Sequence, residues 1–500
     1  MSQGHDRRDP CIIGVAAQTW RGADAPEPLT MWQEVVRAAS LDCGARVDPL
    51  TRLDGLDVVY CQTTQYDQPV DRLCDALGIA PKRRHYSGIG GTTPQQLVDA
   101  NAERMLAGEL DIAVVTSAEA LATQRAIKRR GERPNYSFRP DVRLPFPYEA
   151  PFLPTEVAHE VFQAWLTFAL FDNARRARLG VALDDYRHAL GEMFAPMSRV
   201  AATNEHAWFP TARSVDDIVD PSPENRMVGY PYTKYMVAVM DVDMAAALVM
   251  ATDAAADDLG VPQDQRVYLR GWGYRTDPVY VAEHPDLTRS PALAEAVGLA
   301  LGAAGVGVDD VAHLDLYSCF GASLHFACDA LGLDPCDSRG LTVTGGLPYH
   351  GGPASGYMTH SIVAMVERLR NDSGSFGLTT GVGMHNTKHV AGVWSGVRGA
   401  TEPVPTPEQS EAPEALTIVE QVDGDANVAA YSVVHGRDGA PEWALLVCDV
   451  APGVRAYARL DDPDRLEAAE REELVGTSVR LASEVYDGPA GQGSRNRVVG

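Results

Sequence analysis

The sequence has no two cysteines at the short spacing that zinc and redox motifs use. Its eight cysteines are scattered over positions 11, 43, 61, 74, 319, 328, 336 and 448, so we expect reduced thiols and no metal site. No uncharged apolar run approaches the roughly 18 residues that a membrane span needs. The apolar stretch CIIGVAA near the start is too short for an export signal. We therefore expect a cytoplasmic protein that does not enter a membrane.

Positive charge is also scarce. The 43 Lys and Arg residues against 68 Asp and Glu residues give a net charge of −25, which opposes binding to nucleic acid or to an anionic membrane surface. Apolar residues, in contrast, make up 45% of the 500 positions. That content is enough for several cores, and at about 100 to 200 residues per domain it predicts roughly three domains.

Apolar β-rich runs alternate with amphipathic runs in the first 120 residues. CIIGVAA, a helix over 31–39 and LDVVYCQ come first, and the turn and helix GIGGTTPQQL follow. This alternation predicts βαβ units, a largely parallel sheet and the α/β class. Thr93 to Gln96 fit a capping box with Thr93 as the N-cap, and DIAVVTSAEA reads as a buried strand.

A second stretch of the chain repeats this plan. GGLPYHGGPASGY, from Gly345, precedes a helix with an apolar face, and the strand FGLTTGVG follows. The two turn, helix and strand units predict a duplicated architecture whose glycine turns face a shared centre.

Residues 121 to 230 look less regular and begin with a cationic cluster. Its members are Arg125, Lys128, Arg129, Arg130, Arg133, Arg139 and Arg143. Two interpretations stay open, a solvated surface segment or a clamp for a phosphorylated ligand, since guanidinium forks match phosphate geometry.

A change of composition after Trp394 marks the end of the α/β pattern. TEPVPTPEQSEAPEA, residues 401 to 415, predicts a stiff, exposed linker. LTIVEQV, NVAAYSVV, EWALLVCDV and VRAYARL follow as short predicted strands, with TSVRLAS as the expected last one. Five short strands predict a small β-barrel of the OB type.

Four motifs in this order and spacing carry a resemblance to a known family. They are GGTTPQQLVDANAERMLAGELDIAVVTSAEA, LDLYSCFGAS, GGLPYHGGPASGY and GLTTGVGMHNTKH. Residues 8 to 400 resemble thiolases of the sterol-carrier-protein type, and the whole chain resembles the bacterial thiolase-like protein type 1 group. The resemblance implies two βαβαβ halves in a five-layer αβαβα core, an inserted loop domain and coenzyme A thioesters as ligands. Its expected divisions are 1–120 with 231–270 for the N-terminal half, 121–230 for the inserted domain, 271–400 for the C-terminal half, 401–414 for the linker and 415–500 for the barrel.

The family's reactive positions are degenerate in this sequence. The nucleophilic cysteine aligns with Gly91, the GHP histidine with Gly352 and the second cysteine with Val382. Covalent catalysis needs an attacking atom and a group that deprotonates it, so classical thiolysis or condensation of 3-ketoacyl-CoA is not expected.

Three hypotheses remain, and they belong to different classes. The first is an acyl-CoA-binding protein, with Arg129, Arg130 and Arg139 as the expected phosphate contacts. The second is a non-classical acyltransferase or thioesterase that uses other side chains. The third is a scaffold or partner subunit of an acyltransferase assembly. The fused barrel favours a monomer in each case. The candidate catalytic side chains are His350, Tyr317, His385 and Thr93.

Overall fold

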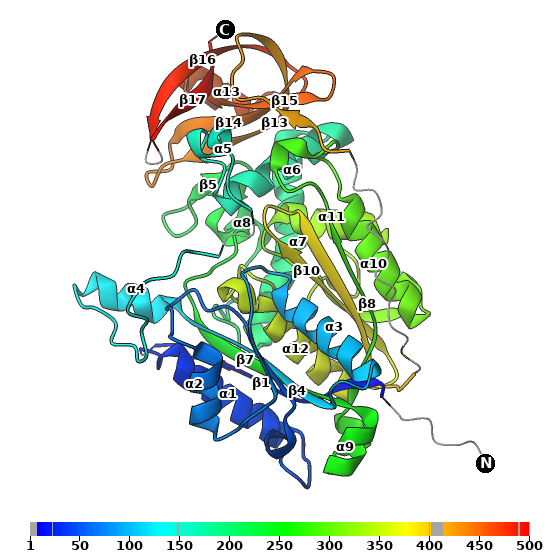
Figure 1. Cartoon of the computed structure of the whole chain (residues 1–500). Coiled ribbons are helices and arrows are strands. Elements are labelled where there is room, and N and C mark those ends of the chain that lie inside the picture. The colour runs from blue at the N-terminus through cyan, green and yellow to red at the C-terminus, as the bar shows by residue number, and fades with distance from the viewer. Residues whose placement is uncertain are drawn as a thin grey trace.

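The computed structural model has a layered α/β body with a β-barrel at one end (Figure 1). It describes residues 8–22, 24–147, 150–399, 401, 414–488 and 491–499. Most of the expected linker, residues 402–413, lies outside the described residues.

The first half of the body contributes five strands to a nine-stranded sheet. β2 pairs with β3 and β4 in parallel, whereas β7 lies antiparallel between β4 and β1. Helix α1, with the buried Trp32 and Val36, covers the outer face of these strands. The elements are β1 (Pro10–Thr19), α1 (Pro28–Asp42), β2 (Gly55–Val58), α2 (Pro69–Leu77), β3 (Arg83–Tyr86), β4 (Ile112–Ala120), β7 (Asp243–Thr252) and α9 (Asp253–Leu259).

The second half completes the sheet in the order β8, β11, β10 and β9. β9 and β10 are parallel, and β11 is antiparallel to both β10 and β8. The elements are β8 (Val267–Thr276), α10 (Pro291–Ala304), β9 (Val311–Asp315), α11 (Gly321–Leu331), β10 (Phe376–Gly383) and β11 (Lys388–Ser395). The predicted strand FGLTTGVG coincides with β10, which confirms that part of the duplicated plan.

Two helices form the central layer between the halves, α3 (Thr93–Leu106) and α12 (Tyr357–Asn371). They pack against each other through one buried apolar core that includes Val98, Met105, Ile362 and Val366. The two halves of the nine-stranded sheet, the outer helices of each half and the central helices between the halves make the five layers that the resemblance implied (Figure 1).

The segment expected to be less regular is mostly helical from residue 154 onward, so that part of the prediction was wrong. Its elements are α4 (Leu121–Arg129), α5 (Pro154–Ala158), α6 (Ala164–Leu179), α7 (Leu183–Thr203), α8 (Val215–Val219), β5 (Met227–Gly229) and β6 (Tyr232–Thr233). Every residue of α6 from Leu166 to Arg176 is buried. A helix enclosed on all sides shows no apolar stripe, so sequence periodicity does not reveal it.

The C-terminal region forms a closed five-stranded barrel, as expected, but from a different set of strands. The ring runs β13, β14, β15, β17, β16 and back to β13. Its elements are β13 (Gly424–His435), β14 (Pro441–Ala451), β15 (Val454–Leu460), α13 (Pro463–Ala469), β16 (Ser478–Gly488) and β17 (Gly491–Val498). This strand order, with a helix between the third and fourth strands, is that of an OB fold.

Two strand assignments in the barrel need correction. LTIVEQV forms only the two-residue β12 (Thr417–Ile418), which pairs with β15 outside the ring. TSVRLAS is not the last strand, because β17 follows it with the sequence GQGSRNRV. That strand has a single large apolar residue, so its sequence lacks the alternation of apolar and polar residues by which strands are predicted.

The barrel docks on the inserted segment through backbone and side-chain contacts. The amide of Tyr230 donates to the carbonyl of Val433 at 2.8 Å, so the barrel sheet continues into β5 and β6. Arg176, which is buried, makes two hydrogen bonds of 2.8 Å to the carboxylate of Glu473. The Asn173 amide donates to the carbonyl of Tyr431 at 2.8 Å.

Candidate functional site

The two glycine turns meet at the N-terminal ends of α3 and α12. The amide of Gly90 donates to the hydroxyl of Ser355 at 3.0 Å, across 265 positions of sequence. In the second glycine turn, the carbonyl of Gly356 accepts a hydrogen bond of 3.5 Å from the hydroxyl of Ser117 in β4. The expected shared centre therefore exists, and both helix N-termini border it.

The entrance to α3 differs from the predicted capping box. The helix begins at Thr93, and its N-cap is Thr92, which makes no side-chain capping bond. The Thr92 hydroxyl lies instead 3.2 Å from the side-chain oxygen of Gln96. The prediction that Thr93 is the N-cap was wrong by one residue, because the chain at Thr92 already has helical dihedral angles.

Gly91 has no room for a side chain. A Cβ atom added there would overlap the carbonyl oxygen of Val382 and lie 2.5 Å from the hydroxyl oxygen of Tyr317. Real Cβ atoms do not approach other atoms so closely, and one of the two obstacles is backbone. We call the convergence of Gly91, Tyr317 and Val382 the central site.

Tyr317 closes the central site from the side of the second half. Its side chain is buried, and burial raises the pKa of its phenol well above the usual value. The backbone amide of Tyr317 donates to the Thr380 hydroxyl at 2.9 Å, and its ring meets Tyr357 edge to face at 5.4 Å. Gly352 packs nearby against Leu347, with its amide bonded to the carbonyl of Val239.

None of the eight cysteines is an activated thiol. Burial is the first cause of a raised pKa at every one of them. Cys319, two residues from Tyr317, has its pKa raised to about 12 and lies 3.5 Å from the Ser323 hydroxyl. Since the thiolate is the nucleophile, a raised pKa disfavours the reactive form of each of these thiols.

The two candidate histidines lie in different surroundings. His385 follows β10, and its Nδ1 is 2.9 Å from the hydroxyl of Thr167. Burial lowers the pKa of His385 to about 4. His350 is buried against Tyr357 and His360, at ring distances of 5.9 and 5.4 Å, and its pKa is also lowered to about 4.

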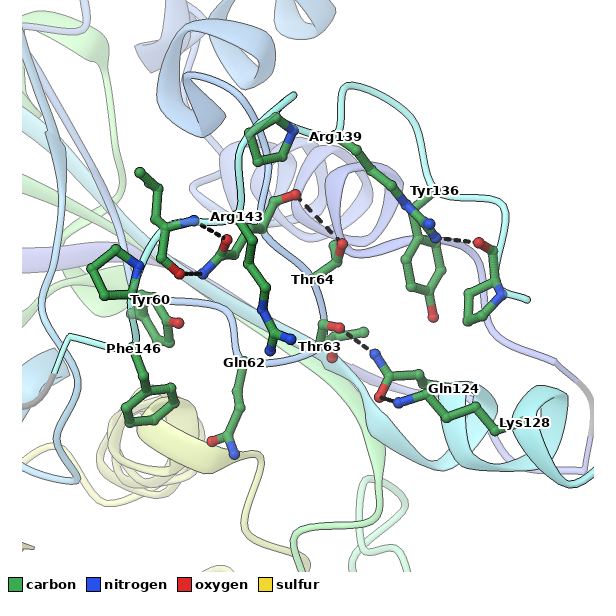
Figure 2. Close-up of a pocket in the computed structure, with 15 residues that line it drawn as sticks. Tyr60, Gln62, Thr63, Thr64, Gln124, Lys128, Tyr136, Arg139, Arg143 and Phe146 are labelled. Carbon is green, nitrogen blue, oxygen red and sulfur yellow. Dashed lines mark hydrogen bonds between the residues drawn. The ribbon is translucent and has the colours of Figure 1, made fainter. Parts of the chain in front are cut away.

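A cavity of about 850 Å³ lies under the cationic segment (Figure 2). Residues 131 to 147 pass over it, and we call them the strap and the cavity the strap pocket. The loop after β2 forms the opposite wall. The lining residues are Tyr60, Gln62, Thr63, Thr64, Gln65, Gln124, Lys128, Pro134, Tyr136, Arg139, Pro140, Arg143, Leu144, Pro145 and Phe146.

Three cations line the strap pocket without a carboxylate partner among the described residues. They are Lys128, Arg139 and Arg143. Figure 2 shows the Arg143 guanidinium pointing toward Gln62 and Thr63. Phe146 meets Tyr60 edge to face at 6.0 Å, and Arg139 lies 5.6 Å from the ring of Tyr136. The pocket thus combines unpaired positive charge with aromatic surface.

The predicted phosphate contacts divide between two places. Arg139 lines the strap pocket, whereas Arg129 and Arg130 on and beside α4 are exposed and outside its lining. Arg130 is paired with Asp24 at 2.7 Å. Sequence reasoning did not single out Tyr60, the loop after it or Tyr136, because no local pattern places them opposite the strap.

The strap is held by hydrogen bonds at three points. Glu27 accepts from the amide and the hydroxyl of Ser137, both at 2.7 Å. Gln65 makes two bonds to the backbone of Leu144, at 2.8 and 2.9 Å. The amide of Asp67 donates to the carbonyl of Phe138 at 2.7 Å. The strap is therefore fastened to the first half along its length.

A buried carboxyl group supports the opposite wall of the strap pocket. Glu119, at the end of β4, is 2% exposed and accepts bonds from the amides of Gln62 and Thr63 at 2.6 and 2.8 Å. The Thr63 hydroxyl also donates to it, at 2.5 Å. Burial raises the pKa of Glu119 to about 7 despite these donors.

One wall of the strap pocket is hydrogen-bonded to the segment that leads to the central site. The amide of Tyr60 donates at 2.9 Å to the hydroxyl of Ser87, the residue just before GIGG. Barrel residues do not line the pocket, and the barrel lies away from α4, at the top of the view (Figure 1).

Two further properties bear on the kind of site. Within the described part of the chain, no three His, Cys, Asp or Glu side chains are arranged to hold a metal ion. No described helix is both long and apolar enough to cross a membrane.

Comparison with known proteins places this geometry in a family. The model of the thiolase-like protein type 1 additional C-terminal domain matches residues 405–485. The crystal structure of a monomeric SCP2-thiolase like protein type 1 from Mycobacterium smegmatis has 31% sequence identity, covers 99% of this chain and 100% of its own, and has a TM-score of 0.83. The structure of acetyl-CoA acetyltransferase from Syntrophomonas wolfei, at 16% identity, 78% and 100% coverage and a TM-score of 0.56, is similar in fold alone. Among curated proteins, no sequence matches this one. The identity and coverage of the first structure show that the chain belongs to the SCP2-thiolase-like protein type 1 family.

Proposed function

We propose that this protein binds an acyl-CoA thioester and does not catalyse thiolysis or condensation of 3-ketoacyl-CoA. The absence of thiolase chemistry is supported by one observation, the contact of Gly91 with the Val382 carbonyl and the Tyr317 hydroxyl. The resemblance to thiolases assigns the attacking sulfur to position 91. Here that volume is occupied by the Val382 carbonyl, which is not a nucleophile, and by the phenol of Tyr317, whose raised pKa disfavours the attacking phenolate.

The proposed binding of acyl-CoA is supported by the strap pocket. Coenzyme A carries phosphate groups and an adenine ring at one end, and unpaired guanidinium groups bind phosphate through parallel hydrogen bonds. Arg139, Arg143 and Lys128 supply that charge, and Tyr60, Tyr136 and Phe146 supply aromatic surface for a base. The pantetheine arm would run from this pocket along the Tyr60 to Ser87 connection toward the central site.

Isothermal titration calorimetry tests the binding. We expect acetyl-CoA to bind, and its 3′-dephospho analogue to bind at least about tenfold more weakly, because one charge-assisted contact is lost. The absence of heat with acetyl-CoA and with longer acyl-CoA esters would overturn the proposal.

A coupled assay tests the chemistry in the same preparation. With acetoacetyl-CoA and CoA we expect no thiolysis, and with acetyl-CoA alone no release of free CoA. Turnover of about one per second or faster, the lower end of ordinary enzyme rates, would contradict the proposal and favour non-classical acyl transfer or hydrolysis.

The oligomeric state is part of the same proposal. The related protein from Mycobacterium smegmatis is described as monomeric, and edge strand β3 carries Arg83, Arg84 and His85, which are charged or polar side chains of the kind that discourage strand pairing. We expect a monomer by light scattering at micromolar concentration, and a stable dimer would refute this.

A further inference from the structure

A second cavity, of about 430 Å³, lies along one face of α12 and shares no lining residue with the strap pocket. Its volume is within the range of about 300 to 1,000 Å³ that is usual for small-molecule sites. The buried His350 and His360 form its floor, and the exposed Glu205, Glu367 and Arg368 line its mouth. We call it the histidine cavity.

The floor of the histidine cavity holds a buried side chain with no partner. His360 is 2% exposed, and neither of its ring nitrogens has a hydrogen-bond partner in the described structure. Burial lowers the pKa of this imidazole, so the ring is neutral and offers one N–H donor and one acceptor nitrogen. Because a buried polar group without a partner is destabilising, a ligand that fits the floor has to supply both an acceptor and a donor.

The neighbouring polar groups are mainly hydrogen-bond acceptors. Nδ1 of His350 lies 3.2 Å from the carbonyl oxygen of Gly351, to which it donates, and burial lowers the pKa of this ring too. Nε2 of the neutral His350 is therefore an acceptor. The carboxylates of Glu205 and Glu367 accept as well, whereas Arg368 donates. The cavity thus favours a ligand with several donors and at least one acceptor.

The charges around the mouth of the cavity balance. Burial also lowers the pKa of His206 at its side, so that ring adds no positive charge. Arg370 is bonded to Asp42 at 2.7 Å, and Arg21 donates to the backbone carbonyl of Glu205 at 2.8 Å. Net charge therefore favours neither a cation nor an anion. The three carboxylates are Glu205, Glu367 and Asp42, and the three guanidinium groups are Arg21, Arg368 and Arg370.

We propose that the histidine cavity binds a small uncharged polyhydroxy compound, whose hydroxyl groups accept from His360 and donate to the acceptor nitrogens and carboxylates around it. A hydroxyl group both donates and accepts, whereas an ammonium group only donates and a carboxylate or phosphate group only accepts. The apolar side chains of Val200, Val343 and Val363 in the lining would contact the C–H groups of the carbon skeleton. This site goes beyond the proposed acyl-CoA binding and does not depend on it.

Saturation-transfer NMR with myo-inositol tests this inference. Cyclohexanol is the control with the same ring and one hydroxyl group, and 1,4-diaminobutane and succinate are the charged controls. We expect myo-inositol to bind at least about tenfold more tightly than cyclohexanol, because it makes more hydrogen bonds, and more tightly than either charged compound.

Two variants test the residues that carry the inference. His360→Phe should weaken myo-inositol binding about tenfold, since it removes both ring contacts, and Glu367→Gln about threefold, since it removes a charged acceptor. Glu103→Gln on α3, an exposed glutamate away from the cavity, should bind as the unaltered protein does.

Four results would overturn the inference. They are no saturable transfer to myo-inositol, equal affinity for myo-inositol and cyclohexanol, tighter binding of the diamine or of succinate, and unchanged myo-inositol affinity in Glu367→Gln. The last result remains decisive if His360→Phe does not fold, because Glu367 is on the surface. Acetyl-CoA binding, measured by calorimetry in the same variants, should not change, which distinguishes failure of this site from failure of the strap pocket.

Discussion

The central site and the strap pocket differ in the space that they leave open. At the central site, the Tyr317 hydroxyl and the Val382 carbonyl lie against the bare backbone of Gly91. The strap pocket is a cavity of about 850 Å³ whose cations have no carboxylate partners in the described chain. The proposed function assigns recognition to the strap pocket and the family's reaction to the central site, and in that assignment binding can persist where the chemistry does not.

The largest expected effect tests whether the strap pocket binds acetyl-CoA, because the contrast with the central site depends on that binding. Replacing Lys128, Arg139 and Arg143 together with alanine should weaken acetyl-CoA binding at least about a hundredfold, since three charge-assisted contacts are removed. Calorimetry measures this effect. The matched control changes Arg129, Arg130 and Arg133, which lie in the same segment but outside the pocket lining. Equal loss of affinity in both triple variants would mean that general charge, and not the pocket, attracts the ligand.

The closed state of the central site is tested by adding one methyl group. Gly91→Ala should lower the free energy of unfolding by about 2 kcal/mol, because overpacked sites cost about 1 to 3 kcal/mol and the Val382 carbonyl cannot move freely. Urea denaturation measures the change. Gly88→Ala is the control, since a Cβ atom there meets nothing within 4 Å. Equal stability of the two variants would show that position 91 has room for a side chain.

The wall of the strap pocket should respond to pH through Glu119. Its pKa of about 7 in the folded protein lies above the ordinary value of 4.5, so the folded state holds the proton more tightly. The resulting stabilisation is full below about pH 4.5 and is lost as the pH rises toward 7. Glu119→Gln should therefore reduce the fall in stability between pH 5 and 7, by about 1 kcal/mol per pH unit.

Thermal or urea unfolding at several pH values measures that slope. The exposed Glu103→Gln should keep the slope of the unaltered protein. If Glu119→Gln keeps it as well, the buried carboxyl group does not hold the proton in this range.

The smallest effect is expected at a strap tether. Gln65→Ala removes both hydrogen bonds to Leu144, and we expect acetyl-CoA affinity to fall about two- to threefold, since each exposed bond contributes about 0.5 kcal/mol or less. Gln33→Ala on α1, which loses a bond to its own helix, should leave affinity unchanged. Tighter binding in Gln65→Ala would show that the strap obstructs the pocket.

The sequence predicted those parts of the fold that depend on local pattern. The strand at β10 and the helix after the second glycine turn carry strong periodicity, and both occur where expected. α6 and β17 were missed, because α6 buries polar and charged side chains together with apolar ones on every face, and β17 is almost wholly polar. In both cases the tertiary surroundings decide the structure, and no local signal reports them.

The candidate site divides in the same way. Gly91, Tyr317 and Val382 could be selected from motifs, and the structure brings them into contact. Tyr60 and Arg143 both line the strap pocket, although they lie 83 positions apart in the sequence. Such a pairing arises from how the strap folds back, and only Arg139 among the expected phosphate contacts takes part in it.

The bond between Tyr230 and Val433 has a consequence for how the molecule can be divided. Because one sheet runs through both the barrel and the inserted segment, cutting the chain at the linker would not release two finished pieces. The body would be left with β5 paired to β6 on one side only, and with Arg176 deprived of its counter-ion. We expect such a fragment to self-associate through the open edge of β5, and we therefore expect the body to depend on the barrel for its stability.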